Sequence, residues 1–267
     1  MNRPFAFALA LCAAVPASLA GAQERSSDRE FRWEGTVPSG RWLYVRNLNG
    51  GIRVDRATGN RVEIVAEKSW RRGNPEDVRF EVTQVGSGSQ DVLVCALWYD
   101  NSECDERGYR TRGDGFRRNR NNDVSVEFIV RVPAGVRLGV STVNGGLIIR
   151  GATAEVEAAT VNGGIEAESS GGPVNANTTN GDIEVRMGAS GSGDLSFETT
   201  NGSVEVYLPD PLDAEVDLRT VNGRVGSDFP LTVSGRINPR SIRATIGRGG
   251  RRVELRTVNG SVELRKS

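Results

Sequence analysis

Three glutamates at equivalent positions of a repeated phrase are the residues of this chain best suited to chemistry. Glu166, Glu184 and Glu205 each follow an Asn-Gly pair at the same distance. If the repeats stack, the three carboxylates form a row that could bind a divalent cation or supply the carboxylate pair of a glycosidase. Like charges stacked so closely repel one another. We favour a solvated face whose charge is offset by neighbours such as Arg150 and Arg186.

Other catalytic arrangements find little support. The chain contains no histidine, so it has no Ser-His or Cys-His pair and none of the familiar zinc sites. We therefore predict no catalytic residues and no resident metal. A divalent cation on the glutamate row is the one cofactor for which the sequence offers a place.

A second row directly precedes the asparagines and is predicted to face away from the apolar positions. It consists of Val143, Val161, Val221 and Val258, with Leu48, Thr179 and Thr200 in the same place. An outward row of β-branched residues could be a binding ridge for a polymer or a partner chain. It could equally reflect the β-propensity of these residues beside a tight corner. Both explanations stay open at this point.

These rows depend on a phrase that returns seven times, of which "TVNGGIEA" at 160 is one copy. Its asparagines are Asn49, Asn144, Asn162, Asn180, Asn201, Asn222 and Asn259, with central steps of 18, 18, 21 and 21 residues. Apolar residues alternate on both sides of each Asn-Gly pair, which predicts a strand before and after it. Asparagine and glycine tolerate positive φ and so suit a tight reversal.

The repeat predicts an all-β fold, namely a β-solenoid of two-strand rungs with Asn-Gly corners. The alternative is a meander of β-hairpins that closes as a barrel or sandwich. We favour the solenoid because stacking places like residues on like. Threonines and asparagines on the inner face would then form ladders that satisfy one another's hydroxyls and amides.

The remaining segments are less regular. We predict a signal peptide at 1–22, an irregular N-terminal β region at 23–130 and a continuous regular repeat region at 131–267. Strand-like stretches occur at 61–65, 78–85 and 92–97, and a mobile Arg/Gly-rich loop is expected at 101–122. The long step from Asn222 to Asn259 is interpreted as an excursion or degenerate rung that covers part of the stack. The N-terminal region and the basic Arg265 and Lys266 are expected to guard the exposed sheet edges.

Export is predicted from the first residues, in which Arg3 precedes an apolar run that closes on small residues. No later stretch is long enough to span a bilayer. Cleavage after residue 22 leaves 33 basic and 34 acidic residues, a balance that argues against a nucleic-acid partner. Cys95 and Cys104 are then an even pair in an oxidising compartment, so we predict a local disulfide.

The chain resembles a family of exported bacterial proteins named "putative adhesin". The signal peptide, the segment "VEFIVRVPAGVRLGVSTVNGGL", the recurrent phrase and the closing "IGRGGRRVELRTVNGSVEL" carry the likeness, which extends from about residue 31 to 264. The resemblance implies an extracytoplasmic β-solenoid and brings no catalytic residues.

Our leading hypothesis is a non-enzymatic envelope protein, an adhesin or scaffold, that presents repetitive β faces to a polymer, a glycan or a protein. It would be periplasmic, on the cell surface or secreted. The alternatives are a carbohydrate-active enzyme and an envelope-stress accessory protein.

Overall fold

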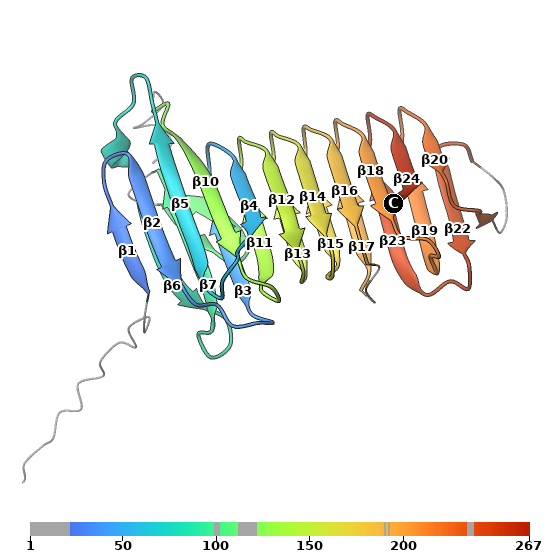
Figure 1. Cartoon of the computed structure of the whole chain (residues 1–267). Coiled ribbons are helices and arrows are strands. Elements are labelled where there is room, and N and C mark those ends of the chain that lie inside the picture. Colours follow the sequence, from blue (N-terminus) through green and yellow to red (C-terminus); the bar gives the residue numbers. More distant parts are fainter. Residues whose placement is uncertain (1–21, 99–101, 112–121, 190, 192, 234–237) are drawn as a thin grey trace, which may run out of the picture.

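Two sheets of eleven strands each lie face to face along most of the molecule in the computed structural model (Figure 1). The structure describes residues 22–98, 102–111, 122–189, 191, 193–233 and 238–267. The predicted signal peptide, up to residue 21, lies outside the described residues. So does the part of the predicted Arg/Gly-rich loop at 112–121.

The first sheet, sheet A, contains in spatial order β1 (Gln23–Ser26), β2 (Glu30–Gly35), β5 (Val62–Ser69), β10 (Ser125–Val132), β4 (Ile52–Arg56), β12 (Leu147–Ala152), β14 (Ile165–Ser169), β16 (Ile183–Met187), β18 (Val204–Leu208), β24 (Val262–Lys266) and β20 (Val225–Ser227). The second, sheet B, contains β21 (Thr232–Val233), β22 (Ser241–Ile246), β19 (Ala214–Arg219), β23 (Arg251–Arg256), β17 (Leu195–Glu198), β15 (Val174–Asn177), β13 (Val156–Ala159), β11 (Arg137–Ser141), β3 (Trp42–Arg46), β7 (Asp91–Leu97) and β6 (Arg79–Val85). A short 3₁₀ helix, η1 (Pro75–Asp77), precedes β6.

The repeats form a β-solenoid, as predicted. Each rung consists of one strand of sheet B, an Asn-Gly corner and one strand of sheet A. Strands pair in parallel with the equivalent strand of the neighbouring rung, so that Val156 on β13 lies opposite Val174 on β15. A hairpin meander would instead pair each strand antiparallel with its neighbour in the sequence, which excludes that alternative for the repeats.

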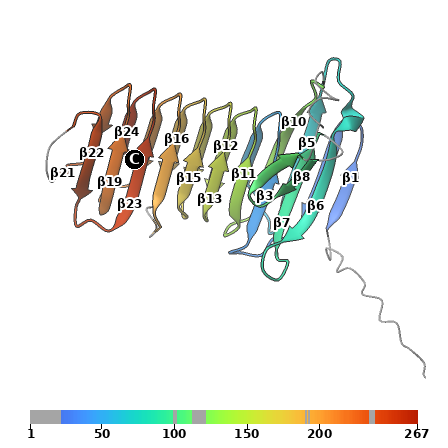
Figure 2. The same ribbon diagram turned by 180° about the vertical axis from the view of Figure 1, so that it is seen from behind.

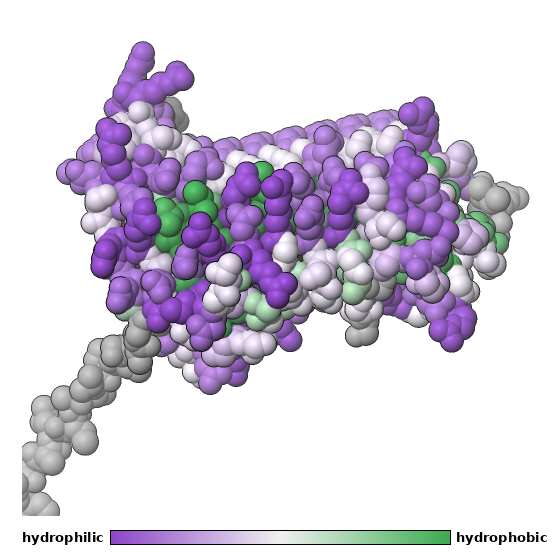
Figure 3. Space-filling model, viewed as in Figure 1, coloured by the Kyte–Doolittle hydropathy of each residue, from purple (hydrophilic) through white to green (hydrophobic). Residues whose placement is uncertain are grey.

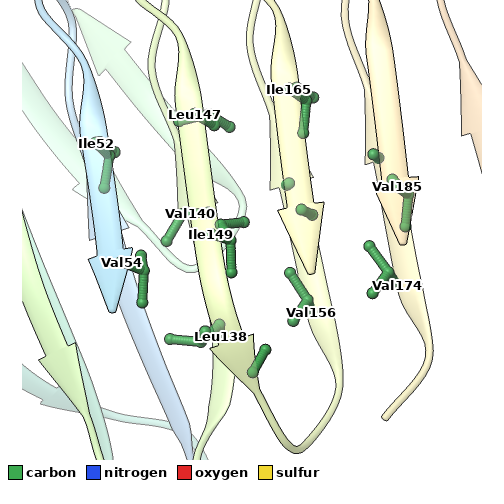
Figure 4. Close-up of a cluster of buried hydrophobic side chains, with 14 of the residues drawn as sticks. Ile52, Val54, Leu138, Val140, Leu147, Ile149, Val156, Ile165, Val174 and Val185 are labelled. Atoms are coloured by element: carbon green, nitrogen blue, oxygen red, sulfur yellow. The ribbon is translucent and has the colours of Figure 1, made fainter. Parts of the chain in front are cut away.

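The core lies between the two sheets and is built by the predicted alternation of side chains. In β13 the pattern of burial alternates residue by residue, with Val156 and Ala158 buried. The buried aliphatic residues of successive rungs stack in columns (Figure 4). Each buried Val, Leu or Ile side chain stabilises the fold by about 1.5–3 kcal/mol relative to an exposed one. The apolar columns therefore hold the rungs in register.

The N-terminal end of the stack is closed by additional strands. The rung made of β3 and β4 packs directly against that of β11 and β12, although a long excursion separates the two in the sequence. Within this excursion β10 pairs with β4, and β5 continues sheet A antiparallel to β10. The strand β2, which precedes the rung in the sequence, pairs antiparallel with β5. The strand-like stretches predicted at 61–65, 78–85 and 92–97 are confirmed as β5, β6 and β7. One regular rung thus lies inside the N-terminal region that the sequence describes as irregular.

At the other end, the last two rungs are exchanged relative to their order in the sequence. The final strands, β23 and β24, lie between the rung of β17 and β18 and the rung of β19 and β20. The C-terminus is accordingly drawn within the row of strands in Figure 1, before the end of the stack. The prediction that Arg265 and Lys266 guard a sheet edge is wrong, because β24 has a neighbour on each side. Instead, β22 and β21 extend sheet B antiparallel beyond β19.

A hairpin forms the first half of the segment predicted as a mobile loop. Its strands are β8 (Ser102–Asp105) and β9 (Gly108–Thr111). The disulfide between Cys95 and Cys104 joins this hairpin to β7. The buried Arg46 donates hydrogen bonds to the Gly139 carbonyl, at 2.7 Å, and to that of Glu106 in the hairpin turn. Burial lowers the pKa of Arg46 from its ordinary value. The hairpin is seen near β7 in the view from behind (Figure 2).

The repeated threonines are buried, as their parity predicts, but they do not bond to one another. Each hydroxyl donates to the carbonyl of a corner glycine on the neighbouring rung, as Thr160 does to Gly145 at 2.9 Å. The equivalent threonines are Thr142, Thr178, Thr199, Thr220 and Thr257. The predicted ladder of hydroxyls is therefore wrong. Each hydroxyl is bound by the backbone of the neighbouring corner instead.

Replacing Thr160 with valine should lower the free energy of unfolding by about 1–2 kcal/mol, because the Gly145 carbonyl loses its donor while the volume of the side chain is kept. Urea denaturation measures this change. Thr179→Val is the matched control. Thr179 directly follows Thr178, which is the equivalent of Thr160 on the next rung, and its side chain is exposed. It should stay within about 0.5 kcal/mol of the parent protein. Equal effects of the two substitutions would contradict the role of the buried hydroxyl.

Candidate functional site

The repeated asparagines form a continuous ladder along one edge of the solenoid. From Asn162 onward, each side-chain amide donates to the side-chain oxygen of the preceding corner in space at 2.7–2.8 Å. In spatial order the members are Asn144, Asn162, Asn180, Asn201, Asn259 and Asn222. Asn49 starts the column but donates to the Val124 carbonyl instead. This row follows the upper rim of the stack, where hydrophilic residues are lined up in Figure 3.

The ladder lies outside the core, which corrects its predicted inward placement. Asn144, Asn162 and Asn180 are all exposed. Strand alternation ends at the buried threonine, because the chain begins to turn there. The asparagine side chains consequently stack on the solvent side of the corner. Like side chains do stack on like, as the sequence predicts.

The corner glycines are needed chiefly because successive corners touch. A Cβ on Gly163 would lie 2.0 Å from the Gly145 carbonyl oxygen, and one on Gly145 would lie 2.1 Å from that of Gly50. Positive φ occurs at only some of these glycines, such as Gly181 and Gly202. None of the asparagines adopts it, since Ser89 is the one non-glycine residue with positive φ in the described part of the chain. The predicted φ-based explanation is therefore wrong at the asparagines.

The candidate ridge runs beside the ladder. In spatial order it consists of Leu48, Val143, Val161, Thr179, Thr200, Val258 and Val221, as the backbone hydrogen bonds between neighbouring corners show. The side chains of Val161, Val258 and Val221 are 40%, 39% and 56% exposed. The exchange of the last two rungs places Val258 between Thr200 and Val221, so that Val221 and not Val258 ends the ridge. We call the ridge and the asparagine ladder together the corner edge.

The glutamate row lies on the outer face of sheet A and has four members. Glu166, Glu184 and Glu205 are neighbours in the parallel register, and Glu263 continues the row beyond Glu205. Sequence reasoning missed Glu263. Its spacing in the sequence could have identified it, because Glu263 follows Asn259 at the same distance as the other three glutamates follow their corner asparagines. It was hidden by the assumption that rungs stack in the order of the sequence.

Every member of the glutamate row contacts a cationic or hydroxyl group. Arg150 pairs with Glu166 at 3.2 Å and Arg186 with Glu184 at 2.7 Å. The Tyr207 hydroxyl donates to Glu205 at 2.8 Å, and this bond raises the pKa of Tyr207. The four glutamate side chains are 27–46% exposed.

Neighbouring pairs of this face are linked to one another. Arg265 contacts Glu205 at 3.5 Å and Glu263 at 2.8 Å. The Arg186 guanidinium lies 3.8 Å from the centre of the Tyr207 ring. The hydrogen bond from Arg186 to Glu184 raises the pKa of Arg186. The face is thus a network of alternating charges, and its outer residues are largely hydrophilic in Figure 3.

Among the residues that the structure describes, no three Cys, Asp or Glu side chains converge to hold a metal ion. No helix within the described ranges has the length and apolar character required to cross a bilayer.

Comparison with known proteins assigns the chain to a domain family. A family model described as Toastrack DUF4097 matches residues 121–265, which is more than half of the chain. No curated protein matches significantly.

Solved structures to which this chain is similar include a "putative cell adhesion protein" from Clostridium sporogenes ATCC 15579. It is 9% identical, with a TM-score of 0.43, and the alignment covers 92% of this chain and 100% of that one. A "putative adhesin" from Bacteroides fragilis NCTC 9343 is 10% identical, with a TM-score of 0.28, and covers 90% of this chain and 98% of its own.

Proposed function

This chain belongs to the Toastrack DUF4097 family, a domain family without an assigned activity. We therefore propose a function from the surface of the protein. It is a non-enzymatic envelope protein that binds an extended glycan along the corner edge. The observation that carries the proposal is the exposed asparagine ladder with an apolar row beside it. Both rows repeat at the strand spacing of about 4.8 Å. A ligand that repeats along its own length can contact such an edge at many equivalent places.

The ladder keeps free hydrogen-bonding capacity. A side-chain amide has two N–H donors and an oxygen with two lone pairs. An internal member such as Asn162 uses one donor toward Asn144 and accepts one bond from Asn180. One donor and one lone pair per corner therefore remain for a ligand. A glycan chain offers hydroxyl groups, which both donate and accept, at regular intervals.

The ridge adds apolar contact area beside these polar groups. Val161, Val258 and Val221 are exposed, whereas Thr179 and Thr200 interrupt the row with methyl and hydroxyl groups. Contiguous exposed apolar residues often mark an interaction site. The combination suits the mixed polar and apolar surface of a sugar chain better than it suits a purely apolar partner.

The glutamate row supports a scaffold more than an enzyme. A glycosidase needs an acid with a raised pKa opposite a second carboxylate. Here Glu166 and Glu184 are each paired with an arginine on an open face. Exposed pairs of this kind contribute at most about 1 kcal/mol each and mainly relieve charge repulsion. A cation site on this row would have to displace the arginines.

Location in the cell envelope is supported by two features. The predicted signal peptide at 1–22 would direct export. The disulfide between Cys95 and Cys104 is of the kind that persists in oxidising compartments.

A panel of envelope polysaccharides, titrated calorimetrically with residues 23–267, tests the proposal. Val161→Asp should weaken saturable binding at least about tenfold, or about 1.4 kcal/mol, because it places a charge in the ridge. Val161→Thr is the matched control and should bind normally, since threonine occupies the same position on the next two rungs, as Thr179 and Thr200. A double change of Glu184 and Glu205 to glutamine should leave binding unchanged. Loss of binding in that double variant, or the release of oligosaccharides by the parent protein, would instead identify the glutamate row as the site.

A further inference from the structure

The seven Asn-Gly pairs are also the places where the chain can modify itself. In such a pair, the glycine amide nitrogen loses its proton to water and attacks the asparagine Cγ. A bond forms between that nitrogen and Cγ, the bond from Cγ to Nδ2 breaks, and ammonia leaves. Water then opens the cyclic imide to aspartate or isoaspartate. The reaction consumes one water, releases one ammonia and involves no redox step.

Six of the seven pairs hold the attacking nitrogen in a backbone hydrogen bond. Each glycine N–H donates to the main-chain carbonyl of the asparagine on the next rung in space. The bonds run from Gly50 to Asn144 (2.7 Å), Gly145 to Asn162 (2.9 Å), Gly163 to Asn180 (2.8 Å), Gly181 to Asn201 (2.9 Å), Gly202 to Asn259 (2.9 Å) and Gly260 to Asn222 (3.0 Å). Attack at these corners requires the stack to open first.

The seventh pair, Asn222–Gly223, lies at the open end of the corner edge. Its asparagine N–H donates to the Val258 carbonyl, and among the described strands β20, which follows this corner, is the last of sheet A, so no described rung lies beyond it. Within the described residues the Gly223 amide donates to no acceptor, and both residues are exposed. The attacking nitrogen is therefore accessible at this corner.

The asparagine side chain is also less restrained at this corner. Asn222 donates to Asn259 at 2.8 Å and, in the part of the chain that the structure describes, accepts no bond from a further corner. Asn180, for comparison, is held on both sides, by Asn162 and Asn201. Rotation of Cγ toward the glycine nitrogen breaks one hydrogen bond at Asn222 and two at Asn180.

We infer that Asn222–Gly223 is the site at which the folded protein deamidates, while the stack protects the other six pairs. The product would weaken the end of the ladder. A carboxylate at this position cannot donate to Asn259 and lies beside its side-chain oxygen. Isoaspartate would also lengthen the backbone of the corner by one carbon. This inference does not depend on the proposed glycan binding.

The test is peptide mapping by mass spectrometry of the full-length folded protein during incubation at mildly alkaline pH. Asn222 should convert at least about tenfold faster than any other Asn-Gly asparagine, which is the rate effect of the one or more additional hydrogen bonds that must break at each other corner. The same incubation in denaturant is the control, in which all seven pairs should convert at similar rates.

Two outcomes would overturn the inference. One is conversion of Asn222 in the folded protein at the rate of the internal pairs. The other is fastest conversion at Asn259, which would place the open end where the sequence, and not the structure, has it. Asn222→Gln provides a second check, because it should remove the fast conversion without creating one at any other corner.

Discussion

Replacing Gly163 with alanine is expected to lower the free energy of unfolding by about 3 kcal/mol, near the upper end of the usual cost of overpacking. The added Cβ would meet the Gly145 carbonyl oxygen at 2.0 Å and its carbon at 2.5 Å. Both are main-chain atoms, so no side chain can rotate away to make room. The corners would have to separate, which also stretches the hydrogen bond from Thr160 to Gly145.

Gly146→Ala is the matched control for this experiment. Its Cβ would have its nearest neighbour, the Gly164 carbonyl oxygen, at 3.5 Å, which is ordinary van der Waals contact. We expect a change within about 0.5 kcal/mol. Urea denaturation of the two variants measures the difference. Similar stabilities would mean that the corners do not approach as closely as the structure indicates.

Deleting residues 251–267 is expected to disrupt the whole C-terminal part of the stack. The deletion removes β23 and β24, which separate two other rungs and pair with both. It takes away four fully buried aliphatic residues, Val253, Leu255, Val262 and Leu264. Their burial contributes on the order of 10 kcal/mol, which is comparable with the entire stability of a typical domain. Limited proteolysis should then cleave readily beyond β18.

An internal excision provides the contrast. Joining Leu212 directly to Arg251 removes β19 to β22 and lets the chain pass from β18 into the rung of β23 and β24, which is the next rung in space. This variant should keep a protease-resistant stack, because the remaining rungs follow one another without a gap. If the 251–267 deletion instead stays resistant as far as Ile246, the rungs must stack in the order of the sequence.

Much of this architecture can be predicted from local patterns. The alternation around each Asn-Gly pair predicts two strands and a corner, and the near-identity of the phrases predicts parallel stacking. Both predictions hold, since Val156 and Val174 are buried partners in neighbouring rungs. The row of Glu166, Glu184 and Glu205 also follows from their constant position in the phrase. In a solenoid every rung meets the same surroundings, so a local pattern repeats as a spatial one.

What the sequence determines by itself is the rung: its strands, its apolar face, its buried threonine and the identity of its corner. The tertiary structure decides how the rungs are ordered, which corner remains open and which side chains the corner turns outward. Asn201 bonds to Asn259 in preference to Asn222, although Asn222 is nearer along the chain. The physical reason is that the phrases are almost interchangeable as stacking partners, so local residues cannot select among them. That choice rests on contacts between distant segments, such as β22 pairing antiparallel with β19 at the end of sheet B.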